Sequence, residues 1–388
     1  MPVLKRIAEM QGEMTAWRRD LHAHPEIAFE EHRTSAFVAD KLREFGIEVS
    51  QGLAKTGVVG TLADGDGPSI GLRADMDALP MPELTALPYQ STVPGKMHAC
   101  GHDGHTTMLL GAAKYLAESR NFKGTVRFIF QPAEELAGGG RVMVEEGLFD
   151  QFPVDSVYGM HNQPNMPTGR IAIRAGIGMA SAASFKIVVH GRGSHAASPH
   201  HGIDPIFVGS QIVSALQSIS SRVTNPIESI VVSVTKFHAG DAVNVLPDTA
   251  VLDGTARSFA EDSETSVAGL IRRIAEGTAT AHGATADIEY RHLYPVLVNA
   301  EAQSLIAENV VRDLLGDDGL EPAFPRTMAS EDFSFMLNAR PGCFVGLGTA
   351  FEGRESHPLH SSKYEFNDEA LPIGASFWAR LVEMELAK

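Results

Sequence analysis

The chain has 388 residues, with 32 basic and 48 acidic side chains and a net charge of −16 at pH 7. At roughly 100–200 residues per domain, this length predicts two domains. The excess of negative charge disfavours nucleic acid and anionic membrane surfaces as partners. The sequence contains neither an apolar run of about 18 residues, as a transmembrane helix needs, nor the apolar core of a secretory signal. With only two cysteines it is no disulfide scaffold, and we expect a cytoplasmic protein.

The first part of the chain alternates amphipathic helices with short apolar strands, which is typical of a mostly parallel α/β sheet. Apolar residues at spacings of three and four predict one helix from Val3 to Leu21. It ends near His24, because a residue that precedes proline avoids the helical conformation. Further helices are predicted at 34–45, 106–117 and 140–146, and strands at 57–62, 69–73, 126–131 and 156–160.

The pattern changes near residue 180. The next segment has the β-α-β-β-α-β order of a ferredoxin-like unit, with strands at 184–190, 229–237, 249–257 and 287–294 and helices at 205–223 and 264–282. The α/β alternation then resumes with a helix at 302–315 and a buried strand at 343–347. The sequence therefore predicts an α/β domain at 1–180 and 295–388, interrupted by an inserted α+β domain at 181–294.

Acidic and histidine side chains follow three of the predicted strands. Asp75 and Asp77 come after the first of these strands, Glu134 and Glu135 after the second, and His161 after the third. In open α/β sheets, ligands bind just beyond the carboxyl ends of the strands. If the three strands are parallel, these five side chains converge on one crevice.

The segment HACGHDGH, between the first two of these strands, has the composition of a metal site. Cys100 and His102 lie one residue apart, and a thiolate and an imidazole are natural ligands for a borderline-soft divalent cation. A single histidine in a polar loop is more often incidental. The glutamate pair and His161 nearby favour the metal interpretation, and His357 or His360 could complete the ligand set.

The adjacent carboxylates of Glu134 and Glu135 would repel each other unless a cation lay beside them. A metal could bind one carboxylate while the other takes a proton from a water that the metal activates. Cys100 could instead act as a thiol nucleophile with His102 or His105, although nearby carboxylates raise a thiol pKa. A non-catalytic binding protein is a third interpretation, which the presence of Glu134 disfavours.

Eight blocks of the sequence together resemble peptidase family M20, subfamily D, over nearly the whole chain. They are RADMDALP, HACGHDGH, QPAEE, MHN, GRGSHAASPH, NVLPD, MASEDF and HPLHSSKYEFND. That group includes hippurate hydrolases, N-acyl-L-amino acid amidohydrolases, plant auxin-conjugate hydrolases and N-acetyldiaminopimelate deacetylases. The resemblance implies a zinc-exopeptidase-like catalytic domain with an inserted lid and dimerisation domain, and therefore a homodimer or a tetramer built from dimers.

The resemblance also implies a set of site residues. One or two divalent ions (zinc, manganese, cobalt or nickel) would be held by Cys100, His102, Glu135, His161 and His360. Glu134 would be the general base, and Asp77 would orient a metal ligand. Where the wider family has a ligand in a His-x-Asp motif, this chain has Asp75-x-Asp77, and Cys100 makes up the ligand count.

In the inserted domain, the resemblance assigns the substrate to three residues. His195 would stabilise the oxyanion, in its own or a partner subunit's site, and Asn244 and Arg257 would contact the substrate carboxylate. The expected reaction is metal-dependent hydrolysis of a small N-acyl-L-amino acid with a hippurate-like acyl group. N-acetyldiaminopimelate or another N-acetyl amino acid is the alternative substrate.

Overall fold

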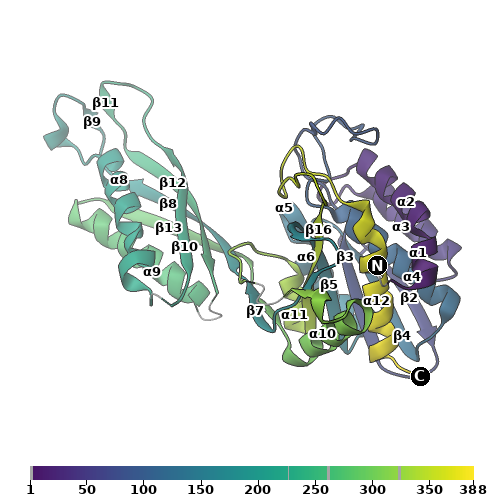
Figure 1. Ribbon diagram of the computed structural model, residues 1–388. Coiled ribbons are helices and arrows are strands. Elements are labelled where there is room, and N and C mark those ends of the chain that lie inside the picture. The colour runs from purple at the N-terminus through teal and green to yellow at the C-terminus, as the bar shows by residue number, and fades with distance from the viewer. Residues whose placement is uncertain (1–2, 226, 260–262, 322–324) are drawn as a thin grey trace. The chain divides into compact units, whose positions relative to one another are not determined.

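The computed structural model describes residues 3–225, 227–259, 263–321 and 325–388, with the backbone alone at 263–266. The chain forms two compact units (Figure 1). The larger unit comprises Met1–Gly176, Val298–Pro325 and Asp332–Lys388, and the smaller unit comprises Ile177–Leu297 and Arg326–Glu331.

An eight-stranded sheet forms the centre of the larger unit, in the order β1-β2-β4-β3-β5-β16-β6-β15. Its strands are β1 (Glu48–Gln51), β2 (Val58–Asp64), β3 (Ser69–Asp75), β4 (Gly124–Gln131), β5 (Ser156–Pro167), β6 (Ile171–Ala172), β15 (Leu320–Glu321) and β16 (Gly342–Ala350). The four central strands, β4, β3, β5 and β16, are parallel to one another. This confirms the predicted mostly parallel sheet, and it places the carboxyl ends of these strands at one edge.

Helices cover both faces of this sheet. The main hydrophobic core lies on the face covered by α1 (Lys5–Glu9), α2 (Gln11–Ala23), α3 (His32–Glu44), α4 (His102–Ser119), α10 (Glu301–Leu315) and α12 (Leu371–Glu385). A smaller core on the other face packs α6 (Gly139–Glu145), α7 (Leu148–Gln151) and α11 (Phe333–Ala339) against the sheet. Among the described residues, no helix combines the length and apolar character that crossing a bilayer requires.

The smaller unit contains a four-stranded antiparallel sheet in the order β10-β12-β8-β13. Its strands are β8 (Ser181–His190), β10 (Ile230–His238), β12 (Thr249–Ser258) and β13 (Thr285–Tyr294), and α8 (Pro205–Leu216) and α9 (Ser263–Ala281) pack on it around one core. This is the predicted ferredoxin-like order. The short strands β9 (Ser194–His195) and β11 (Val245–Leu246) pair with each other, as do β7 (Gly176–Met179) and β14 (Leu297–Asn299).

Two predicted helices are shorter than expected. The helix predicted from Val3 to Leu21 is divided at Met10, where the backbone has φ −88° and ψ 0°. Gly12 follows the break, and glycine is a poor helix former. The predicted helix at 205–223 stays α-helical only to Leu216 and is followed by a π-helical turn. Serine hydroxyls there bond back to main-chain carbonyls, which competes with the regular helical pattern.

β5 is the strand that exceeds its predicted length most. β5 continues past Met160 to Pro167, because β16 runs beside it as far as Ala350. His161 therefore lies within a strand instead of after its end.

Candidate metal centre

The parallel strands bring the predicted residues of the larger unit to one edge of the sheet. β3 ends at Asp75, with Asp77 two residues further on, and β4 is followed by the short helix α5 (Glu134–Ala137). Glu134 and Glu135 thus occupy the first turn of a helix, not the open turn expected from the sequence. His161 projects from β5, next to β3 in the sheet.

Gly101 lets the chain turn between Cys100 and His102 at the start of α4. Its φ is +90°, in the left-handed region that side chains other than glycine rarely adopt. A Cβ atom on Gly101 would lie 2.4 Å from Oδ1 of Asn162 and 2.7 Å from the hydroxyl of Tyr364. Only glycine leaves room for this close approach between α4 and β5.

His102 is fully buried and has a fixed orientation. Its Nδ1 lies 3.2 Å from Oδ1 of Asp77. A carboxylate can only accept, so Nδ1 carries a proton, and Nε2 would have a lone pair once a bound cation replaced its own proton. That Nε2 has no hydrogen-bond partner among the described residues. A buried imidazole oriented by a carboxylate, with its other nitrogen unpartnered, has the arrangement of a metal ligand.

The electrostatics around His102 also favour a cation. Burial lowers the pKa of this imidazole, but the surrounding carboxylates, Asp75 foremost, outweigh burial and raise the pKa to about 10. The second oxygen of Asp77 accepts a hydrogen bond from the main-chain N–H of Glu135 at 3.0 Å. Asp77 therefore positions both His102 and the start of α5.

His161 and Cys100 face each other. Nδ1 of His161 donates to the main-chain oxygen of Asn162 at 2.8 Å, and its Nε2 lies 3.3 Å from Sγ of Cys100. Burial, together with the neighbouring His105, lowers the pKa of His161 to about 3, so this imidazole is neutral. Its Nε2 lone pair is therefore available to a metal.

The thiol of Cys100 lies in an environment that opposes its ionisation. Burial raises its pKa well above the usual value, and the carboxylates of Glu135 and Glu134 raise it further. A nucleophilic cysteine needs the opposite shift. The surroundings of Cys100 thus fit a ligand whose thiolate is stabilised by a bound cation, and they do not fit a thiol nucleophile.

His360 approaches the cluster from the C-terminal part of the larger unit. Its main-chain N–H donates to the oxygen of Ala99 at 2.9 Å, and its Nε2 lies 3.1 Å from Oε1 of Glu135. Burial raises the pKa of Glu135, but the hydrogen bond from His360 and the charge of His102 outweigh it and lower the pKa. The hydrogen bond with Glu135 raises the pKa of His360.

These side chains form one connected cluster. Three groups have their potential ligand atoms within 4.8 Å of one another: Cys100–His102–His161, Cys100–Glu135–His360 and His102–Glu134–Glu135. Cys100, His102 and Glu135 each belong to two of these groups, so the groups are connected. The structure therefore brings together all five predicted ligands and the predicted base.

Three further residues of the site, Asp75, His105 and Asn162, have a positioning role that sequence reasoning did not give them. Asp75, fully buried, accepts from Nη1 of Arg73 at 2.8 Å and lies 2.6 Å from Nδ1 of His105. Nε2 of His105 accepts from the main-chain N–H of Asn162 at 3.0 Å. This chain of bonds holds the main chain at Asn162, whose oxygen orients His161. The spacing of His102 and His105, three residues apart on α4, was the one signal that could have indicated it.

In the smaller unit, His195 and Asn244 lie side by side. They line a cavity of about 490 Å³, and the main-chain N–H of Ala196 donates to the oxygen of Asn244 at 3.0 Å. Nδ1 of His195 accepts from the main-chain N–H of Ala197 at 3.0 Å. In the neutral imidazole the proton is then on Nε2, which points its donor away from the main chain.

Arg257 is not brought to this pair. It lies near one end of β12, and Thr249 is at the opposite end. Thr249 pairs with His190, which comes shortly before β9 in the sequence. A ten-residue strand spans about 30 Å. Figure 1 shows β9 and β11 together at one end of the sheet of the smaller unit. Within one copy of this unit, Arg257 thus lies far from β9, which carries His195, and from β11, which follows Asn244, and the expectation that Asn244 and Arg257 contact one substrate carboxylate stays a prediction.

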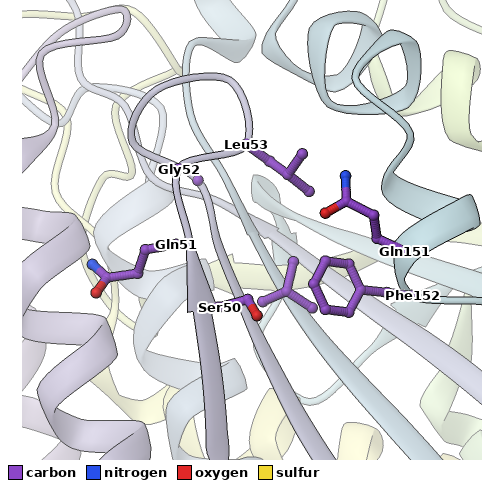
Figure 2. A pocket seen from close by; sticks show the side chains of 8 residues that line it. Ser50, Gln51, Gly52, Leu53, Gln151 and Phe152 are labelled. Carbon is purple, nitrogen blue, oxygen red and sulfur yellow. The ribbon is translucent and has the colours of Figure 1, made fainter.

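A separate cavity of about 250 Å³ lies beside β1 in the larger unit (Figure 2). It is lined by Ser50, Gln51, Gly52, Leu53, Gly57, Val59, Gln151 and Phe152. None of these eight residues is ionisable, so the cavity offers no acid–base or metal chemistry.

Known proteins resemble the chain over its whole length. Residues 71–384 match peptidase family M20/M25/M40. The hippurate hydrolase of Campylobacter jejuni is 42% identical over 382 residues, which cover 98% of each chain. The chain belongs to peptidase family M20. The N-acetylcysteine deacetylase of Bacillus subtilis is 40% identical over 372 residues, or 95% of this chain and 96% of that protein.

A solved structure from Bacillus subtilis, described as a dinuclear metal binding peptidase of the M20 family, has a TM-score of 0.83 and 36% identity, and the match covers 98% of this chain and 99% of that one. M20 peptidases bind one or two divalent metal ions and act on amide bonds, and this member is a hydrolase of that kind. The cluster fits such an ion, because it combines a thiol, imidazoles and carboxylates around the unpartnered Nε2 of His102. The predicted family, enzyme class and divalent cofactor are thus confirmed.

Proposed function

We propose that this M20 hydrolase cleaves N-acyl-L-amino acids with a hippurate-like acyl group into a carboxylic acid and a free amino acid. The observation that carries the proposal is the cluster of five potential ligands around the buried Glu134, of which Cys100 and His102 are buried as well. The hippurate hydrolase of Campylobacter jejuni, 42% identical over 98% of both chains, supports the choice of acyl group.

The cation would be held by Cys100, His102, Glu135, His161 and His360. When bound, a divalent ion supplies Lewis-acid chemistry: it polarises the amide carbonyl and lowers the pKa of water. The chain fixes the donors beforehand. Asp77 determines which nitrogen of His102 is free, and the oxygen of Asn162 does the same for His161.

Glu134 is the proposed general base. It is buried at the first position of α5, and its carboxylate belongs to the same group as His102 and Glu135, within 4.8 Å. From there it takes a proton from the attacking water and gives it to the leaving amine nitrogen. A general base is needed because the proton would otherwise pass too slowly from the attacking water to the leaving nitrogen.

His195 and Asn244 are the proposed substrate-binding pair of the smaller unit. His195 would donate from Nε2–H to the oxyanion that forms at the carbonyl, a role that its hydrogen bond from Ala197 supports. Arg257 lies near the end of β12 that is far from His195 and Asn244. Its guanidinium is therefore proposed to bind the substrate carboxylate separately from that pair.

The test is hydrolysis of hippurate by the purified protein before and after exhaustive chelation, with Mn²⁺, Zn²⁺ or Co²⁺ then added back. We expect activity to be lost and then restored. Activity that survives chelation would contradict the metal mechanism and favour a Cys100 nucleophile, which alkylation would then abolish.

N-acetyl amino acids are the second candidate substrates. The 40% identity to the N-acetylcysteine deacetylase of Bacillus subtilis favours them. Turnover of N-acetylcysteine or N-acetyldiaminopimelate without turnover of hippurate would replace the first proposal.

A further inference from the structure

A third cavity, of about 340 Å³, lies beside the candidate metal centre within the larger unit. It is lined by Gln163, Pro164 and Asn165 of β5 and by Ser356, Pro358 and Leu359 of the loop that follows β16. Its first lining residue comes two positions after His161, and its last comes directly before His360. The cavity is therefore flanked on both sides by proposed ligands.

Two of the three lining residues from β5, Gln163 and Asn165, share a face with His161. Side chains alternate along a strand, so 161, 163 and 165 project to one side, at intervals of about 6.6 Å per two residues. The burial pattern has the same period: Asn162, Pro164 and Met166 are buried, and the residues between them are partly or fully exposed. A group attached to a carbonyl carbon next to His161 is thus directed along this face toward Gln163 and Asn165.

The chemistry of the lining selects one end of the substrate. Pro164, Pro358 and Leu359 are apolar, Gln163, Asn165 and Ser356 are neutral, and none of the six carries a charge. A carboxylate placed against these walls would gain no opposite charge, and the apolar ones would displace part of its hydration. The free carboxylate of an N-acyl amino acid is therefore disfavoured here, whereas a neutral acyl group is suited to these walls.

The size of the cavity extends the argument to the kind of acyl group. A cavity of about 150 Å³ is enough to bind benzene. The volume of about 340 Å³ beside β5 exceeds this, so it admits an aromatic ring with the atoms that join it to the carbonyl. An acetyl group would leave most of the cavity unfilled and would bury little apolar surface there.

We propose that the cavity between β5 and residues 356–359 is the acyl-binding subsite and that it gives this enzyme a preference for aromatic acyl groups over acetyl. The inference rests on the proposed function, whose reaction places the acyl carbonyl beside His161 and His360. It adds Gln163, Asn165 and Leu359 as specificity-determining residues.

The test compares two substrates that release the same amino acid, hippurate and N-acetylglycine. Asn165→Trp fills the cavity from the exposed end of β5, away from the proposed ligands, and Asn165→Phe is a smaller replacement should tryptophan prevent folding. We expect the ratio of kcat/KM for hippurate to that for N-acetylglycine to fall by roughly tenfold or more. Gln151→Trp, in the unrelated cavity of Figure 2, is the size-matched control and should leave the ratio within about twofold.

Binding measured without turnover separates this inference from the proposed function. In a Glu134→Gln background, calorimetry gives the Kd of both compounds with and without Asn165→Trp. A selective loss of hippurate affinity of about tenfold supports the subsite even if the wild-type protein hydrolyses neither compound. Unchanged relative affinities, in variants that fold as thermal unfolding shows, would overturn the subsite even if hippurate is turned over.

Discussion

At the scale of single residues, Asp77 holds two of the proposed ligands at once. One of its oxygens accepts from Nδ1 of His102, and the other accepts from the main-chain N–H of Glu135. A carboxylate is required for both contacts, since an amide has only one accepting atom. The side chain is 1% exposed, so water cannot replace either contact.

We expect Asp77→Asn to weaken metal binding by about 10- to 100-fold, the usual cost of losing a partner that orients a ligand. An asparagine NH₂ facing His102 would force the proton from Nδ1 to Nε2 and remove the lone pair that faces the metal. Competition against a chelator of known affinity measures the effect. An unchanged metal affinity would show that Asp77 does not orient His102.

Glu134→Gln should leave metal binding intact and lower kcat by about 10²- to 10⁴-fold, because glutamine keeps the shape of the side chain but cannot accept a proton. The measurement pairs metal content by elemental analysis with turnover of hippurate. Turnover close to the wild-type value would exclude Glu134 as the base. Loss of the metal together with activity would instead make Glu134 a ligand.

At the scale of elements, the start of α4 depends on Gly101. We expect Gly101→Ala to destabilise the fold by about 1–3 kcal/mol and to reduce metal affinity, because the new Cβ would lie 2.4 Å from Oδ1 of Asn162. Urea denaturation and metal titration measure the two effects.

Gly12→Ala is the matched control for that variant. Gly12 lies in α2 with nothing within 4 Å of a Cβ placed on it. There, alanine should stabilise the helix by about 0.5–1 kcal/mol. Equal responses at the two positions would contradict the argument from close packing at Gly101.

Much of the fold was predictable because local patterns determine it. The parallel strands, the ferredoxin-like order and the convergence of Glu135 and His161 follow from apolar runs and strand ends. The division of the first helix at Met10 was missed because its apolar spacing continues through the break. The short helix at Glu134 was missed because four residues are too few to show a period.

Other features of the site were beyond sequence reasoning because they depend on partners distant in the chain. The role of Asp75 shows only in the structure, where Arg73 and His105 bond to it. The role of His105 likewise shows only there, where it bonds to Asn162 of β5. The separation of Arg257 from His195 follows from the length of β12, which motif matching does not consider.

At the scale of the whole chain, a buried polar network ties the beginning of the larger unit to its end. Arg18 of α2 donates to Asp103 and to Asp368, which lies 350 residues further along the chain. His22 connects Asp103, with its Nδ1 at 2.8 Å, to Glu83, with its Nε2 at 3.3 Å. Burial lowers the pKa of His22, but Asp103 and Glu83 outweigh burial and raise the pKa to about 9.

This shift gives stability a defined pH dependence. The pKa of His22 rises from 6.5 to about 9 on folding, so its contribution is complete below pH 6.5 and is lost as the pH rises through 9. The contribution is on the order of 3 kcal/mol. Denaturation at pH 6, 8 and 10 should therefore show a gap between wild type and His22→Gln that closes with rising pH. A gap that is constant across this range would refute the assignment.

Metal removal should destabilise only part of the chain. A ligand that binds the folded state at 100 times its Kd adds about 2.7 kcal/mol to stability, and all five proposed ligands belong to the larger unit. Hydrogen exchange with and without Zn²⁺ should therefore change around Cys100, Glu135, His161 and His360. Equal changes in β8 and α9 of the smaller unit would contradict a site built from the larger unit.

Because the larger unit is made of separate stretches of the chain, its strands become available in a fixed order during synthesis. β16 lies between β5 and β6 in the sheet, yet it is made after the whole of Ile177–Leu297. A growing chain therefore carries a complete smaller unit while the flank of β5 is still an unpaired edge, the kind of surface on which chains associate wrongly. Since His360 follows β16, the ligand set is complete only after β16 has been made. A ribosome that stalls before β16 would leave an incomplete metal site together with an aggregation-prone edge.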